Sequence, residues 1–343
     1  MTNQNSYRLP FLVTSILLII CFLINISLGS VYIPLKSVLN TLTGGLATQD
    51  SWHYIVINYR LPKAITAVLV GSGLGISGLL MQTLFRNPLA GPFVLGISSG
   101  ASLGVAIVIL GSGLFGAVFS TFLISKWSIV IAASLGSFLV LIAVLLTSLK
   151  VRDTMAILII GLMFASITAS IVSVLSYFGS AEQLQQYIFW GFGSLGNLSW
   201  NELLILSIIY TVGLLVSIRS IKALNTLLLG ENYAKSLGLN IKKSRLVIII
   251  STSLLAGTIT AFAGPIAFIG LAIPHLTRQI FNTSNHEILL PAVFLFGSII
   301  MLICDSISQV PNSDLTLPIN AITALVGAPV IIWLLVRKRK MIF

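Results

Sequence analysis

Charged residues are scarce in this chain: only 8% of its 343 residues are Asp, Glu, Lys or Arg, while 57% are hydrophobic. Soluble globular domains carry about 25% charged residues, so this composition excludes that class. The mean hydropathy of +1.06 points the same way. We therefore expect an integral membrane protein surrounded by a lipid bilayer.

Cysteine and nucleotide-binding motifs are also nearly absent. The two cysteines, Cys21 and Cys304, each lie in an apolar run, so the sequence predicts neither a disulfide framework nor a metal site. No GxxxxGK[ST] phosphate loop occurs. The glycine-rich string GSGLGISG at 71–78 lacks the lysine, and we interpret it as close helix packing. We expect no catalytic residue and no cofactor on this chain, so any ATP hydrolysis must take place on another polypeptide.

Long apolar runs are what the sequence does contain. About 20 apolar residues of helix cross a bilayer core, and backbone groups in lipid must be satisfied internally. We therefore predict an all-α, multi-pass fold, with residues 1–343 forming one transmembrane domain. The predicted spans are 11–29, 64–84, 94–111, 128–149, 156–178, 203–218, 246–263, 265–281, 288–307 and 317–336. The eighth is the least regular, because Pro265 and Pro274 interrupt it.

The basic residues indicate the orientation of these ten spans. Fifteen of the 19 Lys and Arg residues fall on one side, and only Lys36, Arg60, Lys63 and Lys126 fall on the other. Because the basic side is cytoplasmic, we expect both termini and the connection 219–245 in the cytoplasm. The net charge of +11 is then a topology signal, and we expect no nucleic-acid partner.

Three function classes fit such a chain: an ion-coupled secondary transporter, a channel, and the membrane subunit of a pump with a separate ATPase. Ion-coupled carriers commonly place titratable residues inside their spans. Here Asp305 and His275 lie near span ends, and the other acidic residues fall in loops or at span boundaries. This pattern disfavours ion coupling, although sodium sites built from backbone carbonyls remain compatible with the sequence.

A polar island separates the sixth and seventh spans. Residues Glu231 to Leu237 predict a short helix that Gly238 ends. Tyr233, Ala234 and Leu237 are expected on its less polar face. An exposed helix of this kind either docks in a groove of a partner protein or lies on the lipid headgroups.

Four long strings, in order, resemble one protein family: the permease subunits of iron-siderophore, heme and cobalamin ABC importers. They are RLPKAITAVLVGSGLGISGLLMQTLFRNPLAGPFVLGISSGA at 60–101, LLLGENYAKSLGL at 227–239, GPIAFIGLAIPHLTR at 264–278 and LPINAITALVGAPVIIWLL at 317–335. The resemblance implies a ten-span subunit in a bacterial cytoplasmic membrane. It also implies a second permease, two cytoplasmic ATPases that bind ATP and Mg, and an extracellular substrate-binding protein.

The resemblance gives roles to several residues. It makes the island a coupling helix that sits in a cleft of the ATPase, with Gly230, Glu231, Tyr233, Ala234, Leu237 and Gly238 at the contact. It also places interruptions of the spans near the translocation pathway: Asn87, Pro88, Gly91, Pro92, Gly264, Pro265 and Pro274. AGPFVLG at 90–96 echoes AGPIAFIG at 263–270, as an inverted repeat would.

Arg60 and Lys63 are cations on the side where cations are few. Their alternatives are snorkelling to the membrane interface and, by the resemblance, docking acidic groups of the binding protein. The chain departs from the family in carrying Gln309 and Thr316 where an arginine and a glutamate are common, and Asn320 at a common glycine. One docking charge is therefore missing, which favours a heterodimer of two different permeases. We expect an iron-siderophore cargo, with heme and cobalamin as alternatives and an ion-coupled transporter as the more distant one.

Overall fold

The computed structural model describes residues 5–45, 49–112, 125–151, 154–309 and 315–336. Within these ranges the chain is helical and contains no strand beyond an isolated bridge between Gln309 and Thr316. The all-α prediction is confirmed. Several cations used to predict the orientation lie outside the described residues: Arg152, Arg337, Lys338, Arg339 and Lys340.

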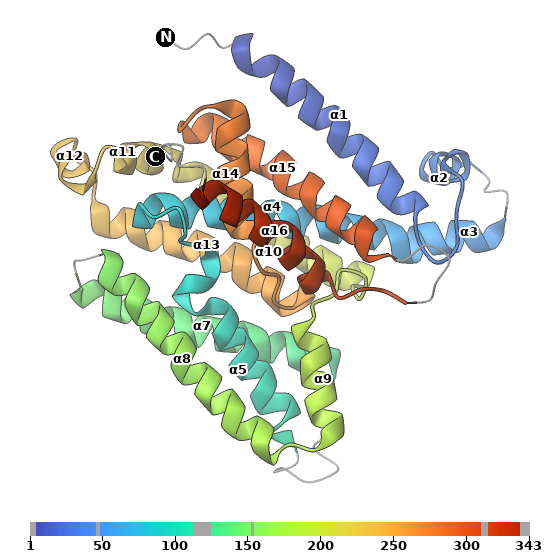
Figure 1. Cartoon of the computed structure of the whole chain (residues 1–343), viewed down its shortest axis with the longest axis horizontal. Coiled ribbons are helices and arrows are strands. Elements are labelled where there is room, and N and C mark those ends of the chain that lie inside the picture. Colours follow the sequence, from blue (N-terminus) through green and yellow to red (C-terminus); the bar gives the residue numbers. More distant parts are fainter. Residues whose placement is uncertain (1–4, 46–48, 113–124, 152–153, 310–314, 337–343) are drawn as a thin grey trace. The chain divides into compact units, whose positions relative to one another are not determined.

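Each of the ten predicted spans contains a helix (Figure 1). These helices are α1 (Asn5–Ser27), α4 (Leu61–Phe85), α5 (Ile97–Ile109), α7 (Lys126–Lys150), α8 (Thr154–Phe178), α10 (Trp200–Arg219), α13 (Ile241–Ala263), α14 (Ile269–Phe281), α15 (His286–Ser308) and α16 (Ile319–Val336). Seven helical segments in the described ranges are long and apolar enough to cross a membrane. The number of crossings and the side of each terminus stay predictions.

Two of the expected spans are shorter than predicted. The run 94–111 divides into a 3-10 turn, η2 (Pro92–Leu95), and the 13-residue α5, with Gly96 left-handed at φ +74° between them. The run 265–281 is helical only from Ile269, directly after Phe268 at φ +66°. A 13-residue helix is about 20 Å long, less than a bilayer core of about 30 Å. In both regions a left-handed residue directly precedes the short helix: Gly96 is the last residue of AGPFVLG, and Phe268 lies two residues before the end of AGPIAFIG. The internal repeat stays a prediction.

The chain divides into two compact units. Two of the four boundaries fall inside α4 and α10, and the other two, at 193/194 and 265/266, fall between helices. The first unit comprises Met1–Ile76, Ser194–Ile208 and Ile266–Ile342, and the second comprises Ser77–Gly193 and Ile209–Pro265. That the whole chain acts as one domain stays a prediction. The connecting elements are α2 (Leu35–Leu42), α3 (Asp50–Ile55), the π-helical turn η1 (Val56–Arg60), α9 (Ala181–Gly191), α11 (Ile221–Leu228) and α12 (Glu231–Ser236).

In the first unit, α15 packs against α1, α14 and α16. The first part of α4 also crosses α15 with almost no space between the backbones. A Cβ added at Gly71 would collide with the carbonyl oxygen of Gly297, and one added at Gly297 would meet Gly71. Gly75 likewise faces Val293 and Ile273. The packing interpretation of GSGLGISG is therefore confirmed for two of its glycines.

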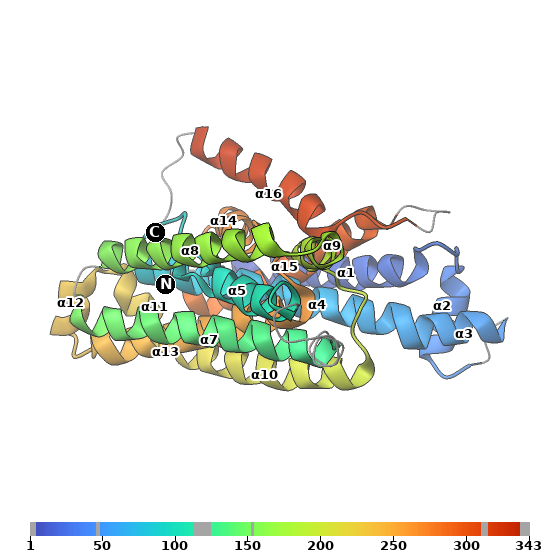
Figure 2. The same ribbon diagram turned by 90° about the horizontal axis from the view of Figure 1, so that it is seen from below.

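In the second unit, α5 packs against α7 and α8, and α13 covers α7 and α5 (Figure 2). Small residues again set the closest approach: Gly100 meets Gly136, and Gly104 meets Ala132. Without a hydrophobic driving force between helices in lipid, such close contacts supply packing energy. The small residues of α5 therefore set how closely α5 and α7 pack in this unit.

Candidate functional site

The polar island between α10 and α13 folds into two short helices, α11 and α12. The helix predicted at Glu231–Leu237 is found as α12, Glu231–Ser236. Gly230 (φ +104°) precedes it and Gly238 (φ +83°) follows it. Both dihedrals favour glycine, so these two glycines set where α12 begins and ends.

The apolar face of α12 differs from the prediction at one residue. Tyr233 and Leu237 are exposed, at 56% and 61%, together with Leu229 at 60%. Ala234, in contrast, is completely buried. We correct its assignment: Ala234 packs inward and cannot contact a partner, because a helix of six residues points adjacent side chains in different directions. We call Leu229, Tyr233 and Leu237 the apolar platform.

An ion pair holds α12 to α13. Arg245 Nη2 lies 3.2 Å from Glu231 Oε1, with the two side chains 10% and 31% exposed. A charge-assisted pair of this kind orients both groups. Glu231 is thus engaged within the chain, and α12 is fixed to a helix that packs against α7 and α5.

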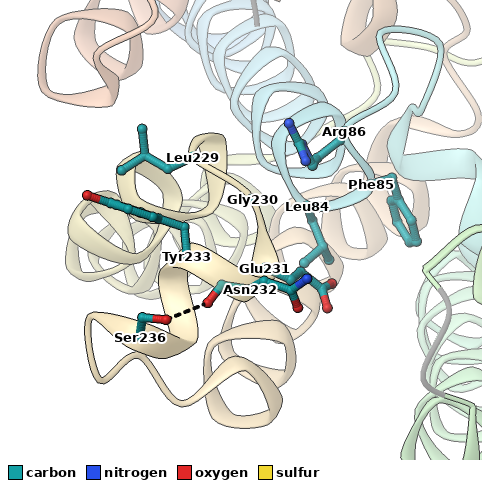
Figure 3. Close-up of a pocket in the computed structure, with 9 residues that line it drawn as sticks. All are labelled: Leu84, Phe85, Arg86, Leu229, Gly230, Glu231, Asn232, Tyr233 and Ser236. Carbon is teal, nitrogen blue, oxygen red and sulfur yellow. Dashed lines mark hydrogen bonds between the residues drawn. The ribbon is translucent and has the colours of Figure 1, made fainter.

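A pocket of about 660 Å³ opens between α12 and the end of α4 (Figure 3). Its lining comes from two stretches, Leu84 to Arg86 and Leu229 to Tyr233, with Ser236. Arg86 begins RNPLAGP, whose Asn87, Pro88, Gly91 and Pro92 were predicted to lie near the translocation pathway. The structure places the start of this turn beside the polar island, a juxtaposition that the sequence did not predict.

All the predicted interruptions except Pro274 lie at or between helix ends, whereas the prediction that Pro274 interrupts its span is wrong, because α14 continues through it. The place of these residues on a pathway stays a prediction. The Asn87 carboxamide accepts from the Leu89 N–H at 2.9 Å across Pro88, and Gly91 and Pro92 lead into η2. Gly264 (φ +77°) ends α13, where a Cβ would approach the Trp190 carbonyl oxygen to 2.8 Å. Pro265 lies before α14 and Pro274 lies inside it.

Arg60 has an internal role that the sequence did not predict. Its Nη1 donates to the carbonyls of Ile26 (2.9 Å) and Ser27 (2.8 Å), and its Nη2 donates to Val31. The first two carbonyls belong to the last turn of α1, where carbonyls lack helical partners and a cation is favourable. Arg60 is 9% exposed, so it fixes the end of α1 and does not snorkel.

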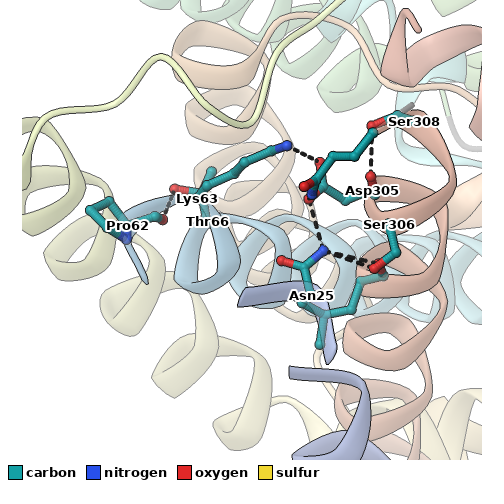
Figure 4. A network of polar contacts seen from close by, with 9 residues as sticks. Asn25, Pro62, Lys63, Thr66, Asp305, Ser306 and Ser308 are labelled. Carbon is teal, nitrogen blue, oxygen red and sulfur yellow. Dashed lines mark hydrogen bonds and ion pairs between the residues drawn. The ribbon is translucent and has the colours of Figure 1, made fainter. Parts of the chain in front are cut away.

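Lys63 belongs to a buried polar network (Figure 4). Its Nζ lies 3.1 Å from Asp305 Oδ1, and the two side chains are 21% and 2% exposed. Asp305 Oδ2 also accepts from Asn25 Nδ2 and Gln309 Nε2, each at 2.9 Å. Lys63 thus pairs inward, against the snorkelling alternative. The sequence could have singled out Asn25 and Asp305 as polar residues inside predicted spans. It could not have shown that they bond to each other, because they lie 280 residues apart in the chain.

A smaller pocket of about 350 Å³ opens beside this polar network. Arg60, Lys63, Tyr59, Gln309 and Thr316 are among its lining residues. The docking prediction for the two cations is not tested by these contacts, but they show that neither is a free surface charge. The two residues that depart from the family pattern, Gln309 and Thr316, line the same pocket and form the bridge of the α15–α16 connection.

Asn320, the third departure, also has a structural contact. Its Oδ1 accepts from the Ala267 N–H at 3.0 Å in the loop that precedes α14. Among the described residues, no group of three or more His, Cys, Asp or Glu side chains could hold a metal ion. The candidate site thus consists of two pockets lined in part by cations, one at Arg86 and one at Arg60 and Lys63.

Comparisons with known proteins agree along nearly the whole chain. Residues 17–337 match the FecCD transport family. The hemin transport permease HmuU of Yersinia pestis is 33% identical over 95% of this chain and 94% of its own. The vitamin B12 permease BtuC of Klebsiella pneumoniae is 34% identical over 95% and 92%. A solved inward-facing structure of a metal-chelate type ABC transporter superposes with a TM-score of 0.82, at 30% identity over 96% of this chain and 98% of that one. This chain belongs to the FecCD transport family and is the membrane permease subunit of an ABC importer.

Proposed function

We propose that this permease carries a metal complex of an organic chelator across the bacterial cytoplasmic membrane. The observation that supports it is the full-length similarity to permeases named for hemin and vitamin B12 and to a metal-chelate type transporter. Hemin and vitamin B12 are both large metal complexes. An iron-siderophore complex, the cargo expected from the sequence, belongs to the same chemical class.

Uptake of three labelled cargoes tests the proposal. Ferric siderophore, hemin and cobalamin would each be offered to cells that lack the chain and to cells that regain it on a plasmid. We expect one cargo to require the chain, and complementation to restore its uptake. If all three uptake rates were independent of the chain, the proposed cargo class would be wrong. Dependence on the proton or sodium gradient with intact ATP would instead favour the ion-coupled alternative.

On the cytoplasmic side, we propose that the apolar platform seats in a groove of a separate ATPase. The exposed Tyr233 and Leu237 suit a helix-in-groove contact. ATP and Mg bind to that subunit. The buried Ala234 and the Glu231–Arg245 pair make α12 rigid relative to α13, so closure of the ATPases would move α13 and the helices packed on it.

On the outer side, we propose that an extracellular binding protein presents an acidic side chain to the pocket at Lys63. Lys63 is the better candidate than Arg60, because three carbonyls already occupy the Arg60 guanidinium. Reversing Lys63 to Glu should slow association, and the wild-type rate should fall with salt because exposed charges are screened over about 10 Å at 0.1 M. An unchanged rate across salt concentrations would refute this contact.

Two neutral residues in the lining of that pocket support a heterodimer. Gln309 and Thr316 replace charges that are common in the family, so a second, different permease would supply the missing docking charge. Co-expression of differently tagged copies of this chain tests the assembly. Recovery of a transport-competent complex containing only this permease would refute the heterodimer.

A further inference from the structure

Arg86 occupies a backbone position that normally suits glycine. The N–H of Arg86 donates to Thr83 at 3.3 Å, and the N–H of Asn87 donates to Gln82 at 3.1 Å. This pair of bonds closes the end of α4 as a Schellman motif, whose left-handed residue is usually glycine. Arg86 fills that place at φ +47°. A side chain in the left-handed region lowers stability, so an arginine here requires a reason outside the local fold.

The Arg86 side chain lies beside the entrance to α12. A Cβ at Gly230 would be 3.4 Å from Arg86 Nη1, so the guanidinium rests near the loop where α12 begins (Figure 3). Gly230 has no side chain to cover it. Arg86 is exposed, and it lines the same pocket as Leu229 and Tyr233 of the apolar platform.

The described residues give Arg86 no ion pair and no hydrogen bond to its side chain. The one carboxylate in the pocket lining, Glu231, is paired with Arg245 on α13. The pocket therefore presents an exposed positive charge beside an apolar docking surface. Its electrostatic complement is a carboxylate, held by whichever molecule covers the platform.

We propose that Arg86 binds an Asp or Glu side chain of the ATPase subunit that docks on the apolar platform. This inference rests on the proposed ATPase contact and adds the residue that gives it charge specificity. Glu231 has a different part, since it holds α12 in place through Arg245. The end of the second span and the coupling helix would then be contacted by the same subunit, although they are far apart in the sequence.

Three variants of the full importer complex test the proposal. Arg86→Gly removes the guanidinium and restores the residue that a Schellman motif favours, so the thermal midpoint should stay level or rise. Retention of the ATPase should nevertheless fall by a factor of about five, the upper range for one exposed pair. Arg86→Glu should weaken retention more, by at least about tenfold, because it adds repulsion. Arg8→Glu, at another exposed cation of the predicted cytoplasmic side, should leave retention unchanged.

Carbodiimide coupling of Arg86→Lys identifies the carboxylate. A lysine amine in contact with a carboxylate is joined to it as an amide, and mass spectrometry of the complex should find residue 86 linked to an Asp or Glu of the ATPase. The measurements are repeated in nanodiscs of purely zwitterionic lipid. An effect of Arg86→Glu that vanished there would assign the site to an anionic lipid headgroup and overturn the proposal. So would normal ATPase retention by both Arg86→Gly and Arg86→Glu.

A platform variant separates this inference from the proposed function. Tyr233→Glu with Leu237→Glu should abolish ATPase retention if the platform docks at all. If that variant lost the ATPase while the Arg86 variants kept it, the platform would stand and the Arg86 contact would be wrong. If neither change affected retention, the proposed ATPase contact itself would fail.

Discussion

Replacing Lys63 with Met should destabilise the chain through the carboxylate that it leaves behind. The substitution keeps an unbranched side chain but removes the ammonium 3.1 Å from Asp305 Oδ1. The Asp305 side chain is only 2% exposed, and breaking one side of a buried pair costs about 3–5 kcal/mol. The Asn25 and Gln309 donors remain, and Lys63 itself is partly exposed. We therefore expect the lower end, about 3 kcal/mol.

Thermal unfolding of the purified chain in detergent measures this effect. Cys304 is fully buried, so with the partly buried Cys21 replaced by Ser, labelling by a thiol-reactive dye reports unfolding. At about 2 °C per kcal/mol for a large chain, Lys63→Met should lower the Tm by about 6 °C. Lys36→Met, at an exposed lysine of α2, is the matched control and should change it by less than about 1 °C.

A double-mutant cycle tells pairing from simple loss of packing. Asp305→Leu alone should also destabilise, because it removes the carboxylate that pairs with Lys63 and accepts from Asn25 and Gln309. The double variant Lys63→Met with Asp305→Leu should be more stable than the sum of the single effects predicts, by about 2 kcal/mol. The pairing of Lys63 with Asp305 would be refuted if the two destabilisations were additive, or if Lys63→Met had the same Tm as the Lys36→Met control.

Three further predictions concern the packing, the coupling helix and the missing phosphate loop. Gly71→Val should prevent the close crossing of α4 and α15 and sharply reduce the amount of folded protein in a fluorescence size-exclusion assay. Gly191→Ala is the control and should be tolerated, because a Cβ at Gly191 meets nothing within 4 Å. Ala234→Trp should make the segment around α12 more susceptible to proteolysis, because the Ala234 side chain is buried. Tyr233→Ala should preserve protease resistance and weaken ATPase retention by roughly 1–2 kcal/mol. Equal protease patterns for the two variants would contradict the assignment of Ala234 as buried and Tyr233 as exposed. The purified chain alone should hydrolyse no ATP in a phosphate-release assay. Turnover free of co-purified ATPase would show that the chain carries a nucleotide site without a GxxxxGK[ST] loop.

The polar island shows how far local sequence patterns reach. Glycines at 230 and 238 and the helix-forming residues between them predicted a short helix, which is found as α12. The pattern could not tell which side chains point outward, because six residues carry too little periodicity to define a face. Contacts from outside the segment decided it, burying Ala234 and exposing Tyr233.

By itself, the sequence determined the helical class and the approximate position of a helix in each of ten apolar runs, because lipid forces each apolar run to satisfy its own backbone hydrogen bonds. It also located the breaks at Pro92 and Pro265, since proline and glycine act on the chain next to them. Only the tertiary structure decided which groups the cations Arg60 and Lys63 contact. Arg60 and Lys63 looked like surface cations, yet one fixes the end of α1 and the other pairs with Asp305. A charge in a low-dielectric environment is governed by its nearest partner, and here those partners come from distant parts of the chain that only folding brings together.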